Sequence, residues 1–231
     1  KKNIPALLIA LGIVVLGWFI YSALNNLAYR DRQVQVRGLA EKEVMANKVT
    51  WPLVMKNLGN NLPQLYEQIN TTNAIAIKFL KENGISEDEI SVNEPVVFDK
   101  DAQRYGGNDN SPYRYTVTEV ITVTSSQVEK VNALIKRQAE LLKQGVALSN
   151  DYEYQTLYEY TGLNDIKPEM IAEATRNARE AAKKFAEDSE SDLGKIKSAT
   201  QGQFSIEDRD AYTPYIKNVR VVTYITYYLE D

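Results

Sequence analysis

The sequence predicts an α+β protein in which one apolar N-terminal helix precedes a single compound domain. Two observations predict this class. A run without charged side chains extends from Ile4 to Leu24. After it, segments with period-two alternation and segments with helical spacing follow one another along the chain. We therefore expect an anchor and tether at 1–33 and one domain at 34–231.

The uncharged run predicts a transmembrane helix. At about 1.5 Å per residue it is long enough to cross a hydrocarbon core of roughly 30 Å. A cleaved signal peptide is the alternative, but its apolar region is usually about 7 to 15 residues long and ends in a small-x-small site, which is poorly matched here. We expect an uncleaved anchor that includes Ile4, Leu7, Leu11, Val15, Trp18, Tyr21 and Leu24.

The basic residues around this run are nearly balanced. Lys1 and Lys2 precede it, and Arg30 and Arg32 follow it. The lysines are closer to the apolar run, which favours a cytoplasmic N-terminus with the main domain outside the cytoplasm.

The domain begins with two predicted strands and a helix. Val34 to Gly38 alternates as a half-buried strand, and Val49 to Met55 gives a second extended segment. Pro52 would have to lie at an edge or bulge, because it cannot donate to a ladder. Apolar residues at helical spacing from Leu62 to Leu80 then predict a helix that stops at Gly84.

A hairpin, a helix and a strand follow. Segments rich in β-branched and aromatic residues, Ser91–Phe98 and Tyr113–Thr124, predict a hairpin whose tip is the loop 106–110. A capping-box pattern at 126–129 opens a helix closed by Gly145, and a strand is expected over Val146–Tyr160.

The order strand, helix, strand, strand, helix, strand is the split β-α-β, or ferredoxin-like, arrangement. A helix over Pro168–Ser189 extends it, with an apolar stripe that includes Ala174, Ala178 and Phe185. Two final strands are expected near Ile196–Ser205 and Val219–Leu229. The complete expectation is a βαββαβ core extended by αββ.

The composition excludes several functions. The chain has neither cysteine nor histidine, which removes disulfides, thiolate chemistry, histidine bases and the usual zinc and haem ligand sets. Its 27 basic and 31 acidic residues are spread along the chain, so no basic stripe suggests nucleic-acid binding. We expect no cofactor and no enzymatic activity.

Two groups of residues are candidate sites. Glu207, Asp208 and Asp210 could supply a carboxylate pair or ligands for a hard cation, but such a cation needs about six oxygen ligands, so a salt-bridged turn is preferred. Four tyrosines share parity on the strand expected at 146–160, and they suit either the core or a subunit interface. They are Tyr152, Tyr154, Tyr158 and Tyr160.

Three stretches make the chain resemble the SIMPL-domain family of bacterial envelope proteins. They are 34–41, the helix around 172–179, and 202–210 leading to 219–223. The resemblance implies an exported or membrane-anchored protein without an assigned enzymatic activity. It also implies possible ring-like homo-oligomers and a link to oxidative stress, although many members have a cleavable signal peptide where this chain predicts an anchor.

These observations lead to one expected function and two alternatives. The expected function is a structural or interaction module that is anchored in the bacterial inner membrane, lies in the periplasm and forms homo-oligomers. The first alternative is an accessory subunit of another membrane complex, whose partner is another envelope protein. The second is a metal-dependent hydrolase that uses the three acidic residues.

Overall fold

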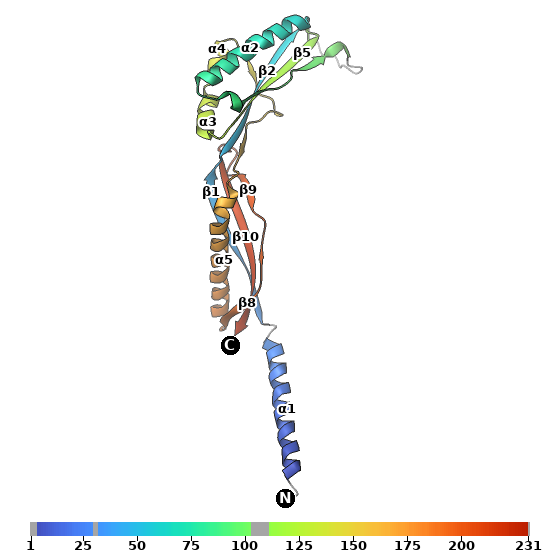
Figure 1. Ribbon diagram of the computed structural model, residues 1–231, viewed down its shortest axis with the longest axis vertical. Coiled ribbons are helices and arrows are strands. Elements are labelled where there is room, and N and C mark those ends of the chain that lie inside the picture. The colour runs from blue at the N-terminus through green and yellow to red at the C-terminus, as the bar shows by residue number, and fades with distance from the viewer. Residues whose placement is uncertain (1–3, 30–31, 103–110, 231) are drawn as a thin grey trace. The chain divides into compact units, whose positions relative to one another are not determined.

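The computed structural model describes residues 4–29, 32–102 and 111–230 (Figure 1). Its first element is a long helix, α1, over Ile4–Tyr29. This helix therefore includes residues 25–29, which the sequence predicted to be part of a tether. The backbones of Ile4 and Leu7 are helical, while their side chains lie outside the described ones.

The described side chains of α1 are largely exposed. Trp18 is 65% exposed, and its ring meets that of Phe19 edge-on at 5.4 Å. The other predicted anchor residues with described side chains are similarly exposed: Leu11, Val15, Tyr21 and Leu24. Among the residues that the structure describes, no helix combines the length and the apolar character needed to cross a membrane.

The chain divides into two compact units. Unit 1 consists of residues 1–43, 163–207 and 218–231, and unit 2 consists of residues 44–162 and 208–217. Each unit has a sheet of its own.

Unit 2 contains a six-stranded antiparallel sheet. Its order is β3–β5–β2–β6, with β4 also paired to β5 and β7 also paired to β2. The strands are β2 (Lys48–Gly59), β3 (Ile90–Val92), β4 (Val96–Asp99), β5 (Tyr115–Ser125), β6 (Leu148–Ser149) and β7 (Leu157–Glu159). The predicted hairpin is confirmed, because β3 and β4 both pair with β5; its tip at 106–110 lies outside the described residues.

Helix α2, Leu62–Glu82, forms as the apolar spacing predicts. Asn61 caps its first turn by accepting a hydrogen bond from Gln64 N, and Gly84 follows its end with φ +82°, a backbone conformation that favours glycine. Its buried stripe packs toward β2 and β5 and comprises Leu65, Ile69, Ala76, Phe79 and Leu80.

The next predicted helix is divided. α3 spans Val128–Lys136 and α4 spans Ala139–Lys143, with Gln138 in helical geometry between them. The predicted capping box does not form. The helix begins one residue later at the N-cap Gln127, whose N–H is accepted by Ser125 Oγ at 3.0 Å. The sequence predicted one continuous helix here, and the break between α3 and α4 was not predicted.

The single strand predicted over Val146–Tyr160 is wrong. Only β6 and β7 form there, and a turn at 151–154 separates them. Alternation of tyrosines therefore did not reflect a continuous pleat.

Unit 1 contains a four-stranded sheet of order β1–β10–β8, with β9 paired to β10. Its strands are β1 (Gln33–Met45), β8 (Asp192–Gln201), β9 (Ser205–Asp208) and β10 (Ile216–Glu230). β10 and β8 are antiparallel, and Leu229 N–H donates to the Arg32 carbonyl at 3.0 Å beside the start of β1. The final strands were thus predicted in kind, but the first of them is two strands, β8 and β9.

Helix α5, Leu163–Asp188, covers one face of this sheet (Figure 1). It begins before the predicted Pro168, which lies within its first turns. Phe185 was predicted to be buried, but it is 61% exposed. The buried stripe is instead composed of small residues at four-residue spacing after Met170: Ala174, Ala178, Ala182 and Ala186.

Candidate functional site

Gly38 is a point of close approach between β1 and α5. A Cβ added at this position would lie 1.8 Å from the Ala174 carbonyl oxygen and 2.5 Å from Ala178 N, so no side chain fits there. Beside it, Asn177 Nδ2 donates to the Leu39 carbonyl at 2.7 Å. Two of the stretches that resemble the SIMPL family therefore meet here, and they form a helix–strand packing site.

Gly202, from the third stretch, plays a similar part at β10. Its N–H donates to the Val222 carbonyl at 2.8 Å, and an added Cβ would lie 2.7 Å from the same oxygen. A shallow cleft of about 430 Å³ adjoins it, lined in part by Arg37, Arg220 and Tyr224. The Arg37 guanidinium stacks 5.2 Å from the Tyr224 ring centre.

Of the two arginines at this cleft, Arg37 lies over the Tyr224 ring and Arg220 pairs with a carboxylate. Arg220 Nε lies 3.3 Å from Glu41 Oε1, and both side chains are about half exposed. Exposed pairs of this kind contribute little to stability. The stretches that mark the family resemblance thus serve packing and surface pairing, and none brings a nucleophile to a base.

Asp208 and Asp210 are held in a salt-bridged turn, which is the interpretation preferred from the sequence. Asp208 pairs with the ammonium of Lys217, a residue only 8% exposed. Asp210 accepts from the Thr213 hydroxyl, from Arg209 Nε at 3.1 Å and from Tyr212 N at 2.8 Å. These hydrogen bonds, that of Thr213 first, lower the pKa of Asp210 to about 2.

Glu207 is exposed at the end region of β9. Within the described part of the chain, no group of three or more acidic side chains is arranged to hold a metal ion. The carboxylates of Asp208 and Asp210 already have protein partners, so the geometry gives the metal-dependent alternative no support.

The four candidate tyrosines do not share one face. Tyr152 is 90% exposed in the turn after β6. Tyr158 on β7 is half-buried, donates to Asn132 Oδ1 and meets the Tyr215 ring edge-on at 6.1 Å. Burial and Tyr215 raise the pKa of its phenol.

Each of the other two tyrosines has a different environment. Tyr160 follows β7, and its hydroxyl donates to the Gly162 carbonyl at 3.0 Å. Tyr154 lines a cleft beside β2. Of the four, Tyr152 alone offers most of its ring to solvent, because the chain turns where a strand was predicted.

Strand pairing in the unit 2 sheet determines which residues of β2 direct their backbone hydrogen-bonding groups toward β6 and β7. Asn93 N–H donates to the Val120 carbonyl at 3.0 Å, so the even-numbered residues of β5 bond toward β3 and β4. Its odd-numbered residues therefore bond to β2. Because Val54 lies opposite Val120, the even-numbered residues of β2 bond toward β6 and β7.

Pro52 is one of these even-numbered residues, and it has no N–H to donate. β7 pairs with β2 as far as Thr50, and β6 pairs from Val54 onward. Between them, residues 150–156 leave the sheet, opposite the proline. Pro52 thus lies at an interruption of the ladder, as its chemistry predicted.

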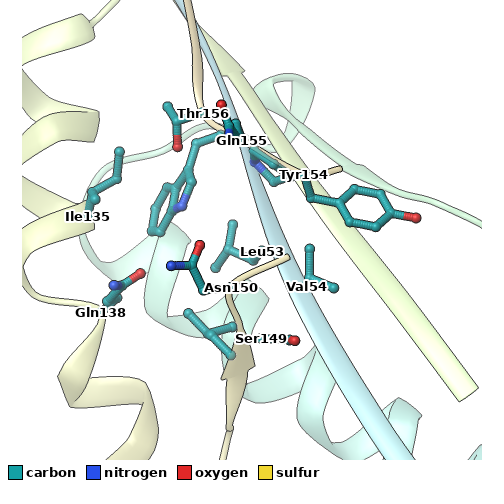
Figure 2. A pocket seen from close by; sticks show the side chains of 12 residues that line it. Leu53, Val54, Ile135, Gln138, Ser149, Asn150, Tyr154, Gln155 and Thr156 are labelled. Carbon is teal, nitrogen blue, oxygen red and sulfur yellow. The ribbon is translucent and has the colours of Figure 1, made fainter. Parts of the chain in front are cut away.

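A cleft of about 360 Å³ occupies this interruption (Figure 2). Leu53 and Val54 line it from β2, while Gln138 and Asn150 approach from the N-cap of α4 and from the segment after β6. Salt-bridged Lys56 and Asp151, at 2.7 Å, tie that segment to β2. Sequence reasoning missed this cleft, and the position of Pro52 was its one signal.

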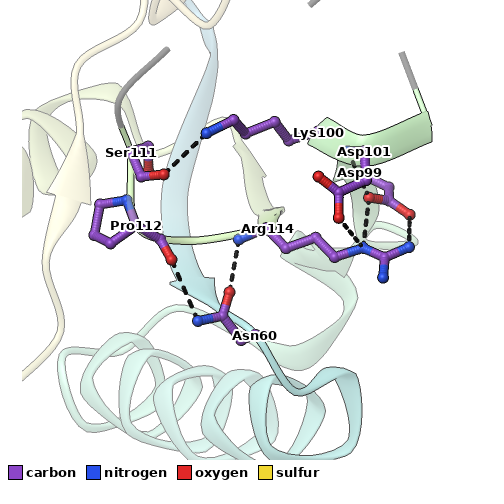
Figure 3. Close-up of polar contacts among 7 residues, drawn as sticks. All are labelled: Asn60, Asp99, Lys100, Asp101, Ser111, Pro112 and Arg114. Carbon is purple, nitrogen blue, oxygen red and sulfur yellow. Dashed lines mark hydrogen bonds and ion pairs between the residues drawn. The ribbon is translucent and has the colours of Figure 1, made fainter. Parts of the chain in front are cut away.

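A polar clamp holds the loop end of the β4–β5 hairpin, where β4 ends and β5 begins (Figure 3). Asn60 accepts from Arg114 N at 2.8 Å and donates to the Pro112 carbonyl at 3.3 Å. The Arg114 guanidinium makes two hydrogen bonds to Asp99, at 3.0 and 2.9 Å, and lies 3.2 Å from Asp101. Its hydrogen bonds lower the pKa of Asp99.

The fold and these sites together define a two-unit α+β protein whose distinctive residues pack an alanine-faced helix on a strand. The family model described as SIMPL, "Protein of unknown function (DUF541)", matches residues 34–221. The chain belongs to the SIMPL family. Comparison with curated proteins gives no match.

Proposed function

We propose that this SIMPL protein is a membrane-anchored module of the bacterial envelope that acts by self-association and not by catalysis. In this proposal α1 lies in the inner membrane and the domain is in the periplasm. The observation that carries it is α1 itself, an isolated apolar helix joined to a family domain. The antiparallel strand order of unit 2 also supports its classification as a ferredoxin-like split β-α-β core.

The anchor rests on length and on the lack of charge. α1 has 26 residues, or about 39 Å at 1.5 Å per residue, against a hydrocarbon core of roughly 30 Å. The uncharged run from Ile4 to Leu24 is longer than the part of α1 whose side chains are described. Within that part, Leu8, Ile13 and Val14 are each more than 60% exposed, a costly arrangement in water.

Self-association is supported by exposed aromatic residues in unit 2. Tyr152 and Tyr212 are 90% and 92% exposed, and neither ring is packed against the fold to any large extent. Tyrosine is enriched at interfaces because it buries a large area and keeps a polar tip. An anchor also confines copies to one plane and raises their effective concentration.

The proposal assigns no catalytic step to the described sites. Ionisable groups there are paired for structure, as Asp210 with Arg209 and Arg114 with Asp99 show. A role through contacts remains, either with copies of the chain or with another envelope protein.

Fractionation of bacterial cells that express the full chain tests the anchor. We expect the protein to stay in the membrane pellet through an alkaline carbonate wash and to be released by detergent. Protease added to spheroplasts should digest the domain, since the proposed domain lies outside the inner membrane. Release by carbonate would contradict the anchor. Protection of the domain until the spheroplasts are lysed would contradict its orientation.

A further inference from the structure

The cleft at Pro52 has an uncharged lining. None of the twelve residues that line it is Asp, Glu, Lys or Arg, although a quarter of the chain is charged. The acidic residue next to Asn150 in the sequence, Asp151, pairs with Lys56 and is not part of the lining. A charged ligand would lose hydration here without gaining a counter-charge, which is costly. The cleft therefore suits a neutral ligand.

Three amide side chains give the cleft hydrogen-bonding groups of both kinds. Gln138, Asn150 and Gln155 each present a carbonyl oxygen and an NH₂ group, and Thr156 adds a hydroxyl (Figure 2). Such a set can donate to a ligand and accept from the same ligand. Hydroxyl groups, which also do both, are the matching chemistry.

Aromatic and aliphatic side chains complete the walls. Trp51 and Tyr154 line the cleft together with Leu53 and Ile135. Trp51 is only 3% exposed and belongs to the buried core, and Tyr154 points away from the amide side chains (Figure 2), so both add apolar surface to the walls and neither is a platform for stacking a ring. The cleft has a volume of about 360 Å³, near the lower end of the range for ligand clefts, about 300–1,000 Å³. This volume limits the ligand to one or two rings.

We infer that the cleft beside Pro52 binds a small uncharged carbohydrate, with Gln138, Asn150 and Thr156 as its hydrogen-bonding residues. The interruption that Pro52 makes in the sheet creates the space, and the uncharged lining selects against charged sugars. This site is independent of α1 and of self-association.

Trp51 provides a direct readout, because the chain has only two tryptophans. In full-length Trp18→Phe protein in phosphatidylcholine nanodiscs, which avoid sugar-headed detergents, the tryptophan fluorescence comes from the cleft alone. Glucose, galactose, mannose and N-acetylglucosamine are titrated, with glucosamine and glucuronate as cationic and anionic rings of the same size. We expect saturable quenching or enhancement by a neutral sugar, and affinities for the two charged rings at least about tenfold weaker.

Two variants test the assignment of residues. Gln138→Leu and Thr156→Val, which keep side-chain size, should each weaken binding of the neutral sugar about tenfold, or about 1.4 kcal/mol. Gln144→Leu, the same change on an exposed residue at the end of α4, should leave it unchanged. Circular dichroism verifies that the variants are folded.

Two outcomes of the titration with unaltered cleft residues overturn the inference, and neither depends on a variant. One is no saturable response to any neutral sugar. The other is binding of glucosamine or glucuronate as tight as that of the neutral rings, because it would remove the role of the uncharged lining.

Discussion

Asn73 Nδ2 donates a hydrogen bond to Glu119 Oε1 across 3.3 Å and so joins α2 to β5 within unit 2. Glu119 is 1% exposed, and burial raises the pKa of its carboxyl. Among the described residues, Glu119 Oε2 and Asn73 Oδ1 are buried without a hydrogen-bond partner, as is Nδ2 of Asn57, which lies opposite Val117 in the pairing of β2 with β5. A protonated carboxyl supplies a donor to this group of atoms, whereas a carboxylate does not.

Glu119→Gln is therefore expected to stabilise unit 2 in a pH-dependent way. A raised pKa means that the folded chain holds the proton more tightly than the unfolded chain does. The contribution of Glu119 to stability is thus greatest below its ordinary pKa of 4.5, and it falls as the pH rises through the pKa of the folded chain. At pH 8 the variant should gain on the order of 1–2 kcal/mol in free energy of unfolding, because it buries no charge.

Thermal unfolding of the full chain at pH 4 and pH 8 measures this effect. The melting temperature of Glu119→Gln should exceed that of the unaltered chain at pH 8 and lose most of that margin at pH 4. Glu94→Gln, at an exposed position of the same hairpin, is the control. A margin that is equal at both pH values would show that ionisation of Glu119 is not involved.

Gly38→Ala should disrupt unit 1. A new methyl group cannot occupy a point 1.8 Å from the Ala174 carbonyl, so β1 and α5 must move apart. We expect a loss of about 3 kcal/mol or more in stability, at or beyond the upper end of ordinary overpacking. Gly12→Ala, where an added Cβ has nothing within 4 Å, should leave the unfolding midpoint unchanged. Equal midpoints for the two variants would contradict the close approach.

The tyrosines should separate into structural and associating residues. Tyr158→Phe removes the hydrogen bond to Asn132 and is expected to lower stability by about 1 kcal/mol without changing self-association. Tyr152→Ser and Tyr212→Ser remove exposed rings, so they should weaken self-association and leave the melting temperature unchanged. Sedimentation velocity over a range of concentrations, combined with thermal unfolding, checks both parts. If Tyr158→Phe weakened self-association and the two serine variants lowered only the melting temperature, the contact surface would lie elsewhere.

Asn60→Ala should loosen the loop end of the β4–β5 hairpin. The Arg114 N–H loses its acceptor, and the Pro112 carbonyl loses its donor. We expect faster hydrogen exchange of the Arg114 amide, by about fivefold if the exposed bond contributes about 1 kcal/mol. Exchange in α5 serves as the internal reference, because that helix belongs to unit 1. Unchanged exchange at Arg114 would mean that the clamp does not hold this end.

Sequence patterns predicted those helices and strands that depend on residues close together in the chain. The spacing from Leu65 to Leu80 marked α2, and Gly84 marked its end, because both depend on residues within one helix. The hairpin followed from β-branched residues in the same way. Identity as a SIMPL protein also followed from short stretches, although their role in packing at Gly38 required the structure.

What the sequence did not predict depends on distant partners. The strand expected at 146–160 breaks because its neighbour β2 contains Pro52, which lies almost a hundred residues earlier. Phe185 was placed in the core by apolar character, yet the close approach of α5 to the sheet favours alanines on the buried face. The buried Glu119 similarly has its partner Asn73 on another element, so nothing local distinguished it from an exposed acid.

Self-association of the anchored chain is tested most directly by light scattering of the full-length protein during size-exclusion chromatography in detergent. The chain has a mass of 26.2 kDa. We predict a protein mass that is a fixed multiple of this value and is maintained on dilution, and a smaller mass for the double variant Tyr152→Ser, Tyr212→Ser. A mass of one chain at every concentration would contradict the proposed function.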